Sequence, residues 1–285
     1  MQLLIGFLLA SLIGYLAYWR QSLSASGMLG AILVGTLIFG LGGWAWGFLL
    51  VAFFVSSSAL SHYKAGLKEA LAEKFSKGGR RDLAQTLANG GAGAVFVVAN
   101  WLWPHPVWWA AFVGAMATVN ADTWATELGV LSKTKPRLVT SFQEVEAGTS
   151  GGISRFGTLA AAAGAGLIAL FAAALSLLGV GSPGAMSVSH WEIYAALALT
   201  IVVVATLSGL LGSLFDSWLG ATVQSIYYCA ACKKETERYP LHKCGAPTRP
   251  LRGWRWLDND WVNFLSSAAG AALAAALWLT LIRWG

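Results

Sequence analysis

The sequence predicts an all-α polytopic membrane protein, a bundle of about seven or eight transmembrane helices with polar loops. Hydrophobic residues make up 56% of the 285 residues and charged residues only 11%, whereas soluble domains carry about 25% charged residues. Several apolar runs reach the roughly 20 residues that a helix needs to cross a bilayer. A β-barrel would show short strands of alternating hydrophobicity instead. The continuous runs therefore indicate helices, which satisfy their own backbone hydrogen bonds in lipid.

The expected helices follow one another along the chain, which we treat as one integral membrane domain, residues 1–285. The first run lacks a basic leader and a cleavage site of small residues, which favours a retained helix over a signal peptide. Only Gly42 and Gly43 separate the second run from the third, so seven spans are an alternative to eight. Residues 213–226 are less apolar and would either extend or break the seventh helix. The eight expected helices cover residues 2–19, 27–42, 44–61, 84–102, 107–128, 156–179, 191–212 and 262–282.

The basic residues predict the orientation of this bundle. The eight-helix map places every lysine and arginine except Arg283 on one side of the membrane, and all of these except Arg20 lie in the loops 61–82, 131–155 and 227–260. Lysine and arginine are enriched in cytoplasmic loops. We therefore expect these loops to face the cytoplasm from a bacterial cytoplasmic membrane. The formal charge of +6 then belongs to the loops and gives no reason to expect nucleic-acid binding.

Three carboxylates lie where apolar helices meet this basic side. The fifth helix ends with Asp122 and Glu127, and the seventh ends with Asp216. Ionisable residues within membrane helices are costly, so they are candidates for function by default. On a regular helix Glu127 shares a stripe with Asn120, and Asp122 lies off it. Both acids can therefore meet one ion only if the helix breaks or if Asp122 faces a neighbouring helix. Solvated helix-end acids are the structural alternative.

A second set of candidate residues surrounds the acids. The loop 146–154, rich in Gly, Ser and Thr, runs directly into the sixth helix, where backbone N–H groups and a helix N-terminus can bind an anion. It lacks the Gly-Lys-Ser/Thr ending of a Walker loop, and a plain turn is the alternative. Amide side chains occur in pairs one turn apart, which also suits helix–helix contacts. The candidate substrate- and nucleotide-binding residues are Gln85, Asn89, Lys133, Arg137, Gly148, Thr149, Ser150, Gly151, Gly152, Ser154, Ser213, Ser217, Gln224, Asn259 and Asn263.

The loop 227–260 carries a possible zinc-knuckle element. It contains Cys229-x2-Cys232, followed by His242-x-Cys244. Four soft ligands in a short loop can form a tetrahedral zinc site, and the spacing resembles one knuckle and a His-x-Cys pair. Disulfides are not expected in a reducing compartment. The sequence thus leaves structural Zn²⁺ and unligated thiols as the two interpretations.

Five motifs follow one another along the chain. They are Gln85-x3-Asn89-Gly-Gly, Asn120-Ala-Asp122-Thr-Trp-Ala-Thr-Glu127-Leu-Gly, Gly148-Thr-Ser-Gly-Gly-Ile-Ser154, Gly212-Ser-Leu-Phe-Asp216-Ser-x-Leu-Gly-Ala-Thr-x-Gln224 and Asn259-Asp-x-Val-Asn263. In kind and order they resemble the family that contains plant phytyl-phosphate kinase and animal transmembrane protein 19. The resemblance spans roughly residues 1 to 285. It implies phosphorylation of an isoprenoid monophosphate to the diphosphate, with CTP or another nucleoside triphosphate as the donor.

The resemblance gives the candidate residues their expected roles. Asp122, Glu127 and Asp216 would be the catalytic residues and would hold Mg²⁺, which prefers carboxylates together with substrate phosphates. The loop 148–154 would bind phosphates. A prenyl phosphate is largely dianionic near neutrality, since its second pKa is about 6, and therefore needs no strong base. The basic residues expected to neutralise charge on the transferring group are Lys133, Arg137 and Arg80 or Arg81.

The sequence alone also allows other classes of protein. One of the acids could act as the base for a prenol, so an alcohol kinase or a lipid cytidylyltransferase-like enzyme is one alternative. An ion-coupled transporter also uses intramembrane acids, although these acids lie at one face and not at the midplane. A scaffold would bind no nucleotide. The expected partners are a nucleoside triphosphate, an isoprenoid lipid phosphate, membrane lipids and a second copy in a homo-oligomer, with no nucleic acid; the expected metals are Mg²⁺ and structural Zn²⁺.

Overall fold

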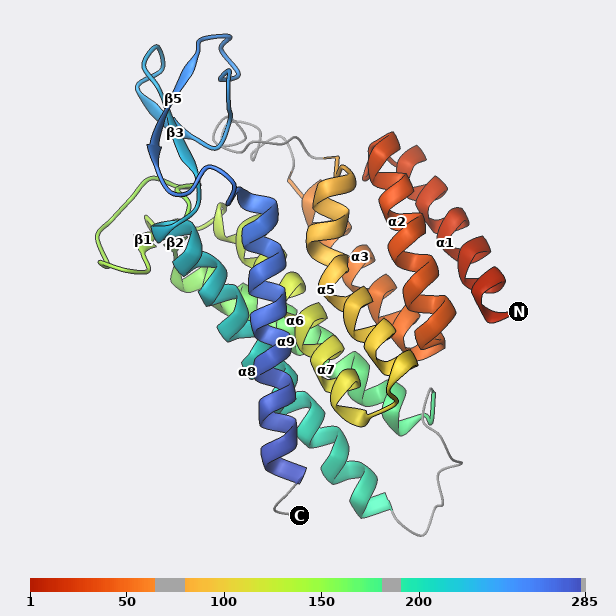
Figure 1. Ribbon diagram of the computed structural model, residues 1–285. Coiled ribbons are helices and arrows are strands. Elements are labelled where there is room, and N and C mark those ends of the chain that lie inside the picture. The colour runs from red at the N-terminus through yellow and green to blue at the C-terminus, as the bar shows by residue number, and fades with distance from the viewer. Residues whose placement is uncertain (65–79, 181–190, 283–285) are drawn as a thin grey trace.

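The computed structural model describes residues 1–64, 80–180 and 191–282, in which long helices form a bundle (Figure 1). Six of the described helical segments are long and apolar enough to cross a membrane, and α5 and α6 are equally long but more polar. The predicted all-α polytopic bundle is therefore confirmed. The helices are α1 (Gln2–Trp19), α2 (Ala25–Leu37), the π-helical turn η1 (Ile38–Gly42), α3 (Trp44–His62), α5 (Leu83–Leu102), α6 (Pro106–Gly129), α7 (Arg155–Leu177), α8 (Trp191–Thr222) and α9 (Asn259–Ile282).

The structure answers two questions that the predicted helix map left open. The second and third runs form separate helices, because Gly43 takes a φ of 86° between η1 and α3, a conformation that glycine adopts without steric cost. The helix α8 continues to Thr222, so most of the segment 213–226 extends it. Within the described residues, each of the eight expected runs thus forms its own helical segment. Lys68, Lys74, Lys77, Arg283 and most of the connection 180–190 lie outside the described residues.

The helix α6 runs through the middle of the bundle and positions the acids. All residues from Ala110 to Ala121 are buried, and the helix contacts α3, α5, α7, α8 and α9. Gly212 of α8 and Gly270 of α9 pack so closely on Thr118 that a Cβ at either position would overlap its side chain. Small residues allow such approaches between membrane helices. The acidic end of α6 is consequently held against its neighbours.

Two small antiparallel sheets lie at one end of the bundle, opposite the C-terminus (Figure 1). The strands β1 (Arg137–Leu138) and β2 (Gly152–Ile153) pair with each other. A three-stranded sheet has the order β4-β3-β5, with β3 (Ile226–Cys229), β4 (Lys234–Thr236) and β5 (Thr248–Arg252). The sequence did not predict these strands, which fold the two loops over the ends of the helices.

Candidate active site

A cavity of about 290 Å³ lies at this end of the bundle and contains all three predicted catalytic acids. Asp122 and Glu127 reach it from α6, and Asp216 reaches it from α8. The helix α6 is continuous through both of its acids. Asp122 therefore meets the cavity because it faces a neighbouring helix, and it lies close enough to Asp216 for the two to interact electrostatically. Of the two arrangements that the sequence allowed, the unbroken helix is the one adopted.

Serine hydroxyls from two other helices orient two of these carboxylates. Ser61 at the end of α3 donates a hydrogen bond to Glu127 Oε1 at 2.6 Å. Ser266 of α9 donates to Asp216 Oδ2 at 2.9 Å. Hydrogen bonds to an ionised acceptor are short and strong, so both contacts fix the direction in which the carboxylates point. Four helices thereby contribute to the position of the acids.

Asn120 belongs to the same motif as Asp122 and Glu127, but its role is to hold helices together. Its side chain is completely buried. Its Nδ2 donates to the Gly164 carbonyl at 2.8 Å, and its Oδ1 accepts from Ser56 at 2.9 Å. Asn120 thus joins α3, α6 and α7 two residues before Asp122, as buried amides in membrane bundles can do.

The loop before α7 forms the opposite wall of the cavity. Ser154 caps the helix, its Oγ accepting the Gly157 N–H at 3.0 Å. Gly151 has a φ of 82° and lies directly on Ala221 of α8, which leaves no room for a side chain. Ser150 donates a hydrogen bond to Gln224 Oε1, just past the end of α8. The loop is therefore held against α8 with the N-terminus of α7 at the cavity, an arrangement suited to an anion.

Arg81 provides a cation at the edge of the cavity. Its Nη1 donates to Ser58 Oγ at 3.0 Å, and its guanidinium lies over the rings of Phe53 and Phe54 at 6.0 and 5.8 Å. Burial lowers the pKa of Arg81 below its ordinary value, and the charge of Glu127 opposes this shift. Guanidinium groups nevertheless stay protonated in proteins. The structure thus distinguishes the two neighbouring arginines, because Arg81 lines the cavity and Arg80 is exposed and does not.

A smaller apolar cavity of about 70 Å³ meets the first one at Arg81. It lies among α1, α2, α3 and α5, and apolar side chains make up most of its wall. Asn89 lines this cavity and not the acidic one. Arg81 is the residue that both cavities share, so a single side chain stands at the junction of a charged space and an apolar space.

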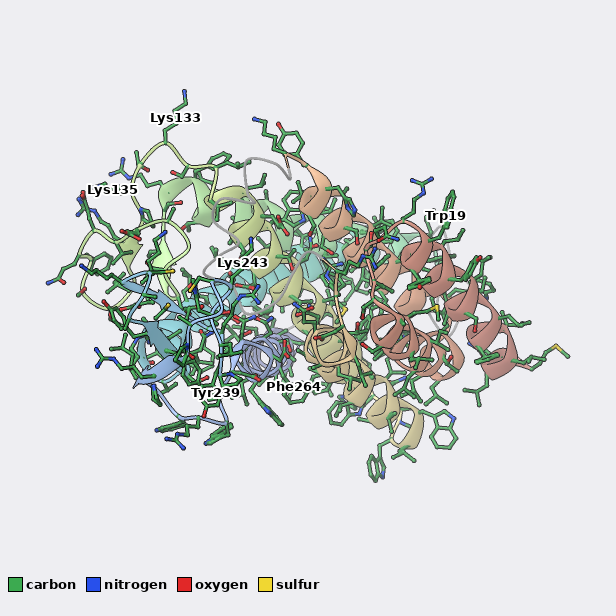
Figure 2. The ribbon with its side chains drawn as sticks, turned by 90° about the horizontal axis from the view of Figure 1, so that it is seen from above. Trp19, Lys133, Lys135, Tyr239, Lys243 and Phe264 are labelled. Atoms are coloured by element: carbon green, nitrogen blue, oxygen red, sulfur yellow. The ribbon has the colours of Figure 1, made fainter. Side chains whose placement is uncertain are left out.

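Most of the predicted binding residues come together, and three do not. Lys133 and Arg137 do not line the acidic cavity. Lys133 is exposed and extends away from the bundle (Figure 2), and Arg137 forms an ion pair with Glu144 at 3.2 Å. Asn89 is the third, as described above. The predicted binding residues that line the acidic cavity are Gln85, Gly148, Thr149, Ser150, Gly151, Gly152, Ser154, Ser213, Ser217, Gln224, Asn259 and Asn263.

Several residues that line the acidic cavity belong to no sequence motif, so the sequence did not identify them as candidates. Ser61 and Thr158 lie in apolar helices, where a single hydroxyl is common. Glu237 follows β4 in the loop that carries the cysteines, and it accepts a hydrogen bond from Gln224 Nε2 at 2.9 Å. Its approach to the cavity depends on the fold of that loop. A capping box between Asp82 and Gln85 is readable in sequence, and it fixes Gln85 at the start of α5.

Comparison with known proteins places the chain in a family. The sequence model of the integral membrane protein family DUF92 matches residues 8–271. The chain belongs to this family. It is 33% identical over 279 residues to Protein PGR of Arabidopsis thaliana, covering 93% of this chain and 92% of that one. It is also 30% identical over 285 residues to an uncharacterized membrane protein of Methanocaldococcus jannaschii, covering 98% and 96% of the two chains.

A further relative connects these findings with the motif resemblance. The chain is 30% identical over 263 residues to Protein VTE6, chloroplastic, of Arabidopsis thaliana, covering 88% of this chain and 64% of that one. The family expected from the five motifs is thereby confirmed. No solved structure matches this DUF92 protein.

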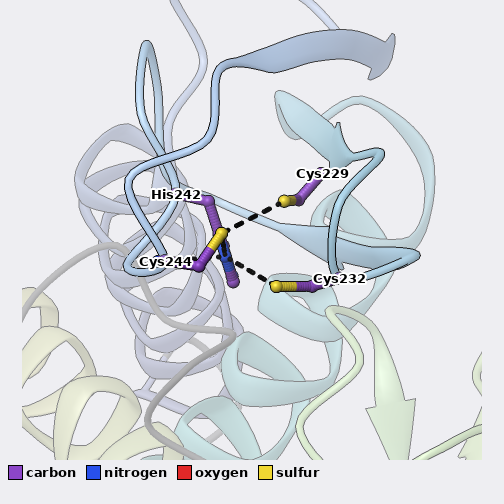
Figure 3. A group of neighbouring side chains, drawn as sticks. All are labelled: Cys229, Cys232, His242 and Cys244. Carbon is purple, nitrogen blue, oxygen red and sulfur yellow. Dashed lines mark hydrogen bonds between the residues drawn. The ribbon is translucent and has the colours of Figure 1, made fainter.

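The four soft ligands of this DUF92 protein converge within the loop after α8 (Figure 3). The ligand atoms of Cys229, Cys232, His242 and Cys244 all lie within 4.8 Å of one another, and the cysteines form no disulfide. Hydrogen bonds from the Ala246 backbone and from His242 lower the pKa of the Cys244 thiol to about 6. Hydrogen bonding with Cys244 raises the pKa of the Cys232 thiol to about 11.

Proposed function

We propose that the acidic cavity is the active site of a nucleoside-triphosphate-dependent kinase that converts an isoprenoid monophosphate to the diphosphate, with CTP as the expected donor. The observation that carries this proposal is the meeting of three carboxylates, the loop 148–154 and Arg81 in one cavity of about 290 Å³. The motif resemblance to the phytyl-phosphate kinase family supports the same reaction. Phosphoryl transfer depends mainly on positioning and charge stabilisation, which these groups can supply.

The carboxylates fit a magnesium ion in their chemistry. Asp122, Glu127 and Asp216 offer hard oxygen ligands in one place, and Mg²⁺ is bound by a few carboxylates plus substrate phosphates. When bound, the ion would neutralise charge on the phosphates of the donor. Ser61 and Ser266 would keep two of the carboxylates turned toward it, because each donates a hydrogen bond to one carboxylate oxygen.

The remaining groups would place the two reacting phosphates. Backbone N–H groups of the loop 148–154 and the N-terminus of α7 would bind the phosphates of the donor. An oxygen of the acceptor monophosphate attacks the γ-phosphorus, the bond to the β–γ bridging oxygen breaks, and the nucleoside diphosphate leaves. The acceptor loses no proton when it is a dianion, which agrees with a cavity that has no histidine among its described lining residues.

The apolar cavity supports a lipid acceptor. Arg81 would bind the acceptor phosphate at the junction, since guanidinium groups pair well with phosphate. The first units of the isoprenoid tail would then lie in the space of about 70 Å³ among α1, α2, α3 and α5, and the rest of the tail would extend toward lipid. A water-soluble acceptor would gain nothing from this space.

We also propose that the cavity faces the cytoplasm, where nucleoside triphosphates are found and basic loops accumulate. The exposed Lys133 belongs to the loop next to the cavity, and the exposed Trp103 belongs to the connection at the other end of α6. A membrane-impermeant maleimide should label Trp103→Cys in intact cells and Lys133→Cys only after the membrane is opened. The reverse pattern would contradict this orientation.

The reaction can be tested with purified protein, CTP labelled in the γ-phosphate and a panel of prenols and prenyl phosphates. The proposal predicts label in the terminal phosphate of a prenyl diphosphate, with prenols unchanged. Label in a prenyl monophosphate would indicate an alcohol kinase, and transfer of the cytidylyl group would indicate a cytidylyltransferase. Ion-dependent transport without nucleotide consumption would support a transporter and refute the kinase.

A further inference from the structure

A third cavity, of about 510 Å³, adjoins the active-site cavity on the side of the β3–β5 sheet. The two share Gly148, Thr149, Ser150 and Glu237, so they are continuous at the phosphate-binding loop. One wall is the segment 144–150 and the other is formed by β3, β4 and their connection. The basic residues that line this cavity are Lys135, Lys233 and Lys234. Four glutamates also line it, namely Glu144, Glu146, Glu235 and Glu237, so charges of both signs are nearly balanced. A polar space that continues the site proposed for phosphates suits the ribose and base of a nucleotide.

The wall made by β3 and β4 belongs to a small module, residues 226–252, which we call the β3–β5 module. It joins the bundle at the end of α8, where Arg252 Nη1 donates to the Gly220 carbonyl at 2.8 Å. Glu237 accepts a hydrogen bond from Gln224 at 2.9 Å. Its strands have only three to five residues and pair over three or four of them, and sheets this small are marginal without added support. The module therefore needs a further constraint to keep its shape.

The soft-ligand cluster supplies that constraint if it binds a metal. Zn–S bonds of about 2.3 Å and Zn–N bonds of about 2.1 Å in a tetrahedron separate two sulfurs by about 3.8 Å, and a sulfur from a nitrogen by about 3.6 Å. Cys229 Sγ and Cys244 Sγ are 3.7 Å apart. Cys232 Sγ and Cys244 Sγ lie 3.5 and 3.2 Å from His242 Nδ1. The donor set and its spacing fit zinc.

We propose that Cys229, Cys232, His242 and Cys244 bind one structural zinc ion, and that this ion holds the β3–β5 module closed as a wall of the cavity that receives the nucleotide. The ion would link the β3–β4 turn directly to the loop before β5. In the sheet itself, these two segments are connected only through β3, which pairs with both β4 and β5. Closure keeps Lys233, Lys234 and Glu237 at the cavity. The role of the wall rests on the proposed kinase function, whereas the metal site does not.

The first measurement is metal content of the purified full-length protein. We expect about one zinc per chain in the wild type and less than a tenth of that in Cys232→Ser and Cys244→Ser. Ala231→Ser is the matched control, because Ala231 is exposed and lies between two ligands without being one. His242→Cys should retain zinc, since four thiolates also form a tetrahedral site. Zinc-free wild-type protein with a fully protected module in hydrogen exchange would overturn the proposal.

The second measurement tests whether the β3–β5 module acts as a wall of the nucleotide cavity, separately from the phosphoryl-transfer reaction. In Cys232→Ser, amide hydrogen exchange in residues 226–252 should accelerate at least tenfold while exchange in α6 stays unchanged. The Kd for Mg-CTP should rise at least tenfold, whereas His242→Cys alone should keep both the exchange rates and the Kd of the wild type. Unchanged nucleotide affinity in a zinc-free variant would overturn the role of the wall. A wild type that holds zinc but binds no CTP would refute the kinase and the wall together, while the zinc stoichiometry would still identify the metal site.

Discussion

The two cavities that meet at Arg81 differ in almost every property. The acidic cavity is built mainly from α6, α8 and the loop before α7, and it contains three carboxylates in about 290 Å³. The apolar cavity is built from α1, α2, α3 and α5, and it has about 70 Å³. Charged groups and hydrocarbon cannot share one environment without cost. The difference supports the proposed lipid phosphate, whose ionic head and apolar tail would be divided between the two halves of the bundle.

The largest expected effect lies on the acidic side. Asp122→Asn and Asp216→Asn keep the shape of each side chain and remove its charge. Turnover of the prenyl phosphate should fall about a hundred- to a thousandfold, which corresponds to ~2.7–4 kcal/mol of lost electrostatic stabilisation. The measurement is initial rate of diphosphate formation at matched amounts of inserted protein. Asp258→Asn serves as the control because Asp258 is exposed and lines none of the three cavities, and asparagine can cap a helix as aspartate does. Equal rates for all three variants across a Mg²⁺ titration would refute the catalytic role of these acids.

A smaller effect is expected at the junction. Arg81→Gln removes the cation that both cavities share, and hydrogen bonds to charged groups contribute about 1.5–3 kcal/mol. The KM for the prenyl phosphate should rise roughly ten- to a hundredfold, with a weaker effect on the KM for CTP. Arg80→Gln is the adjacent control, since Arg80 is exposed and does not line the cavity. Similar losses in both variants would show that the arginines act only through the general charge of the loop.

The smallest effect should appear on the apolar side. Val51→Phe places a ring in the apolar cavity, whereas Val55→Phe adds the same ring one turn along α3 at an exposed position. Poor fit in an apolar pocket costs about a factor of ten or more per misplaced methylene. We expect Val51→Phe to lower kcat/KM about tenfold for prenyl phosphates of every chain length, because the first isoprenoid units would occupy this cavity, and Val55→Phe to leave it unchanged. Equal values in the two variants would contradict a role for the apolar cavity.

The helices and the acids could be predicted because their causes are local. Apolar runs of sufficient length specify membrane helices wherever they occur. Asp122 and Asp216 were identifiable because a carboxylate within an apolar helix has a cost that needs a reason. The order of five motifs identified the family. In each case the information lies within a few consecutive residues.

The rest depends on contacts between distant segments. Ser61 and Glu127 lie in different helices, and nothing in the sequence of α3 indicates that its last serine meets an acid of α6. Arg80 and Arg81 are adjacent and chemically identical, so only the fold shows which of them enters the cavity. Lys133 is a cation and lies only six residues after Glu127 in the sequence, yet its side chain points away from the bundle (Figure 2). The apolar cavity is a product of helix packing and has no motif at all.

The central claim is that one lipid phosphate occupies both cavities, with its phosphate at Arg81. Photo-crosslinking with a prenyl monophosphate that carries a diazirine on the first isoprene unit tests this most directly. The claim predicts that crosslinks map to residues lining the apolar cavity, that an unlabelled prenyl phosphate suppresses them, and that Arg81→Gln lowers their yield at least tenfold. The lining residues expected to react are Ala10, Ala31, Val34, Leu50, Val51 and Asn89. Crosslinks confined to the exposed apolar side chains of α8, with no competition and no dependence on Arg81, would contradict it.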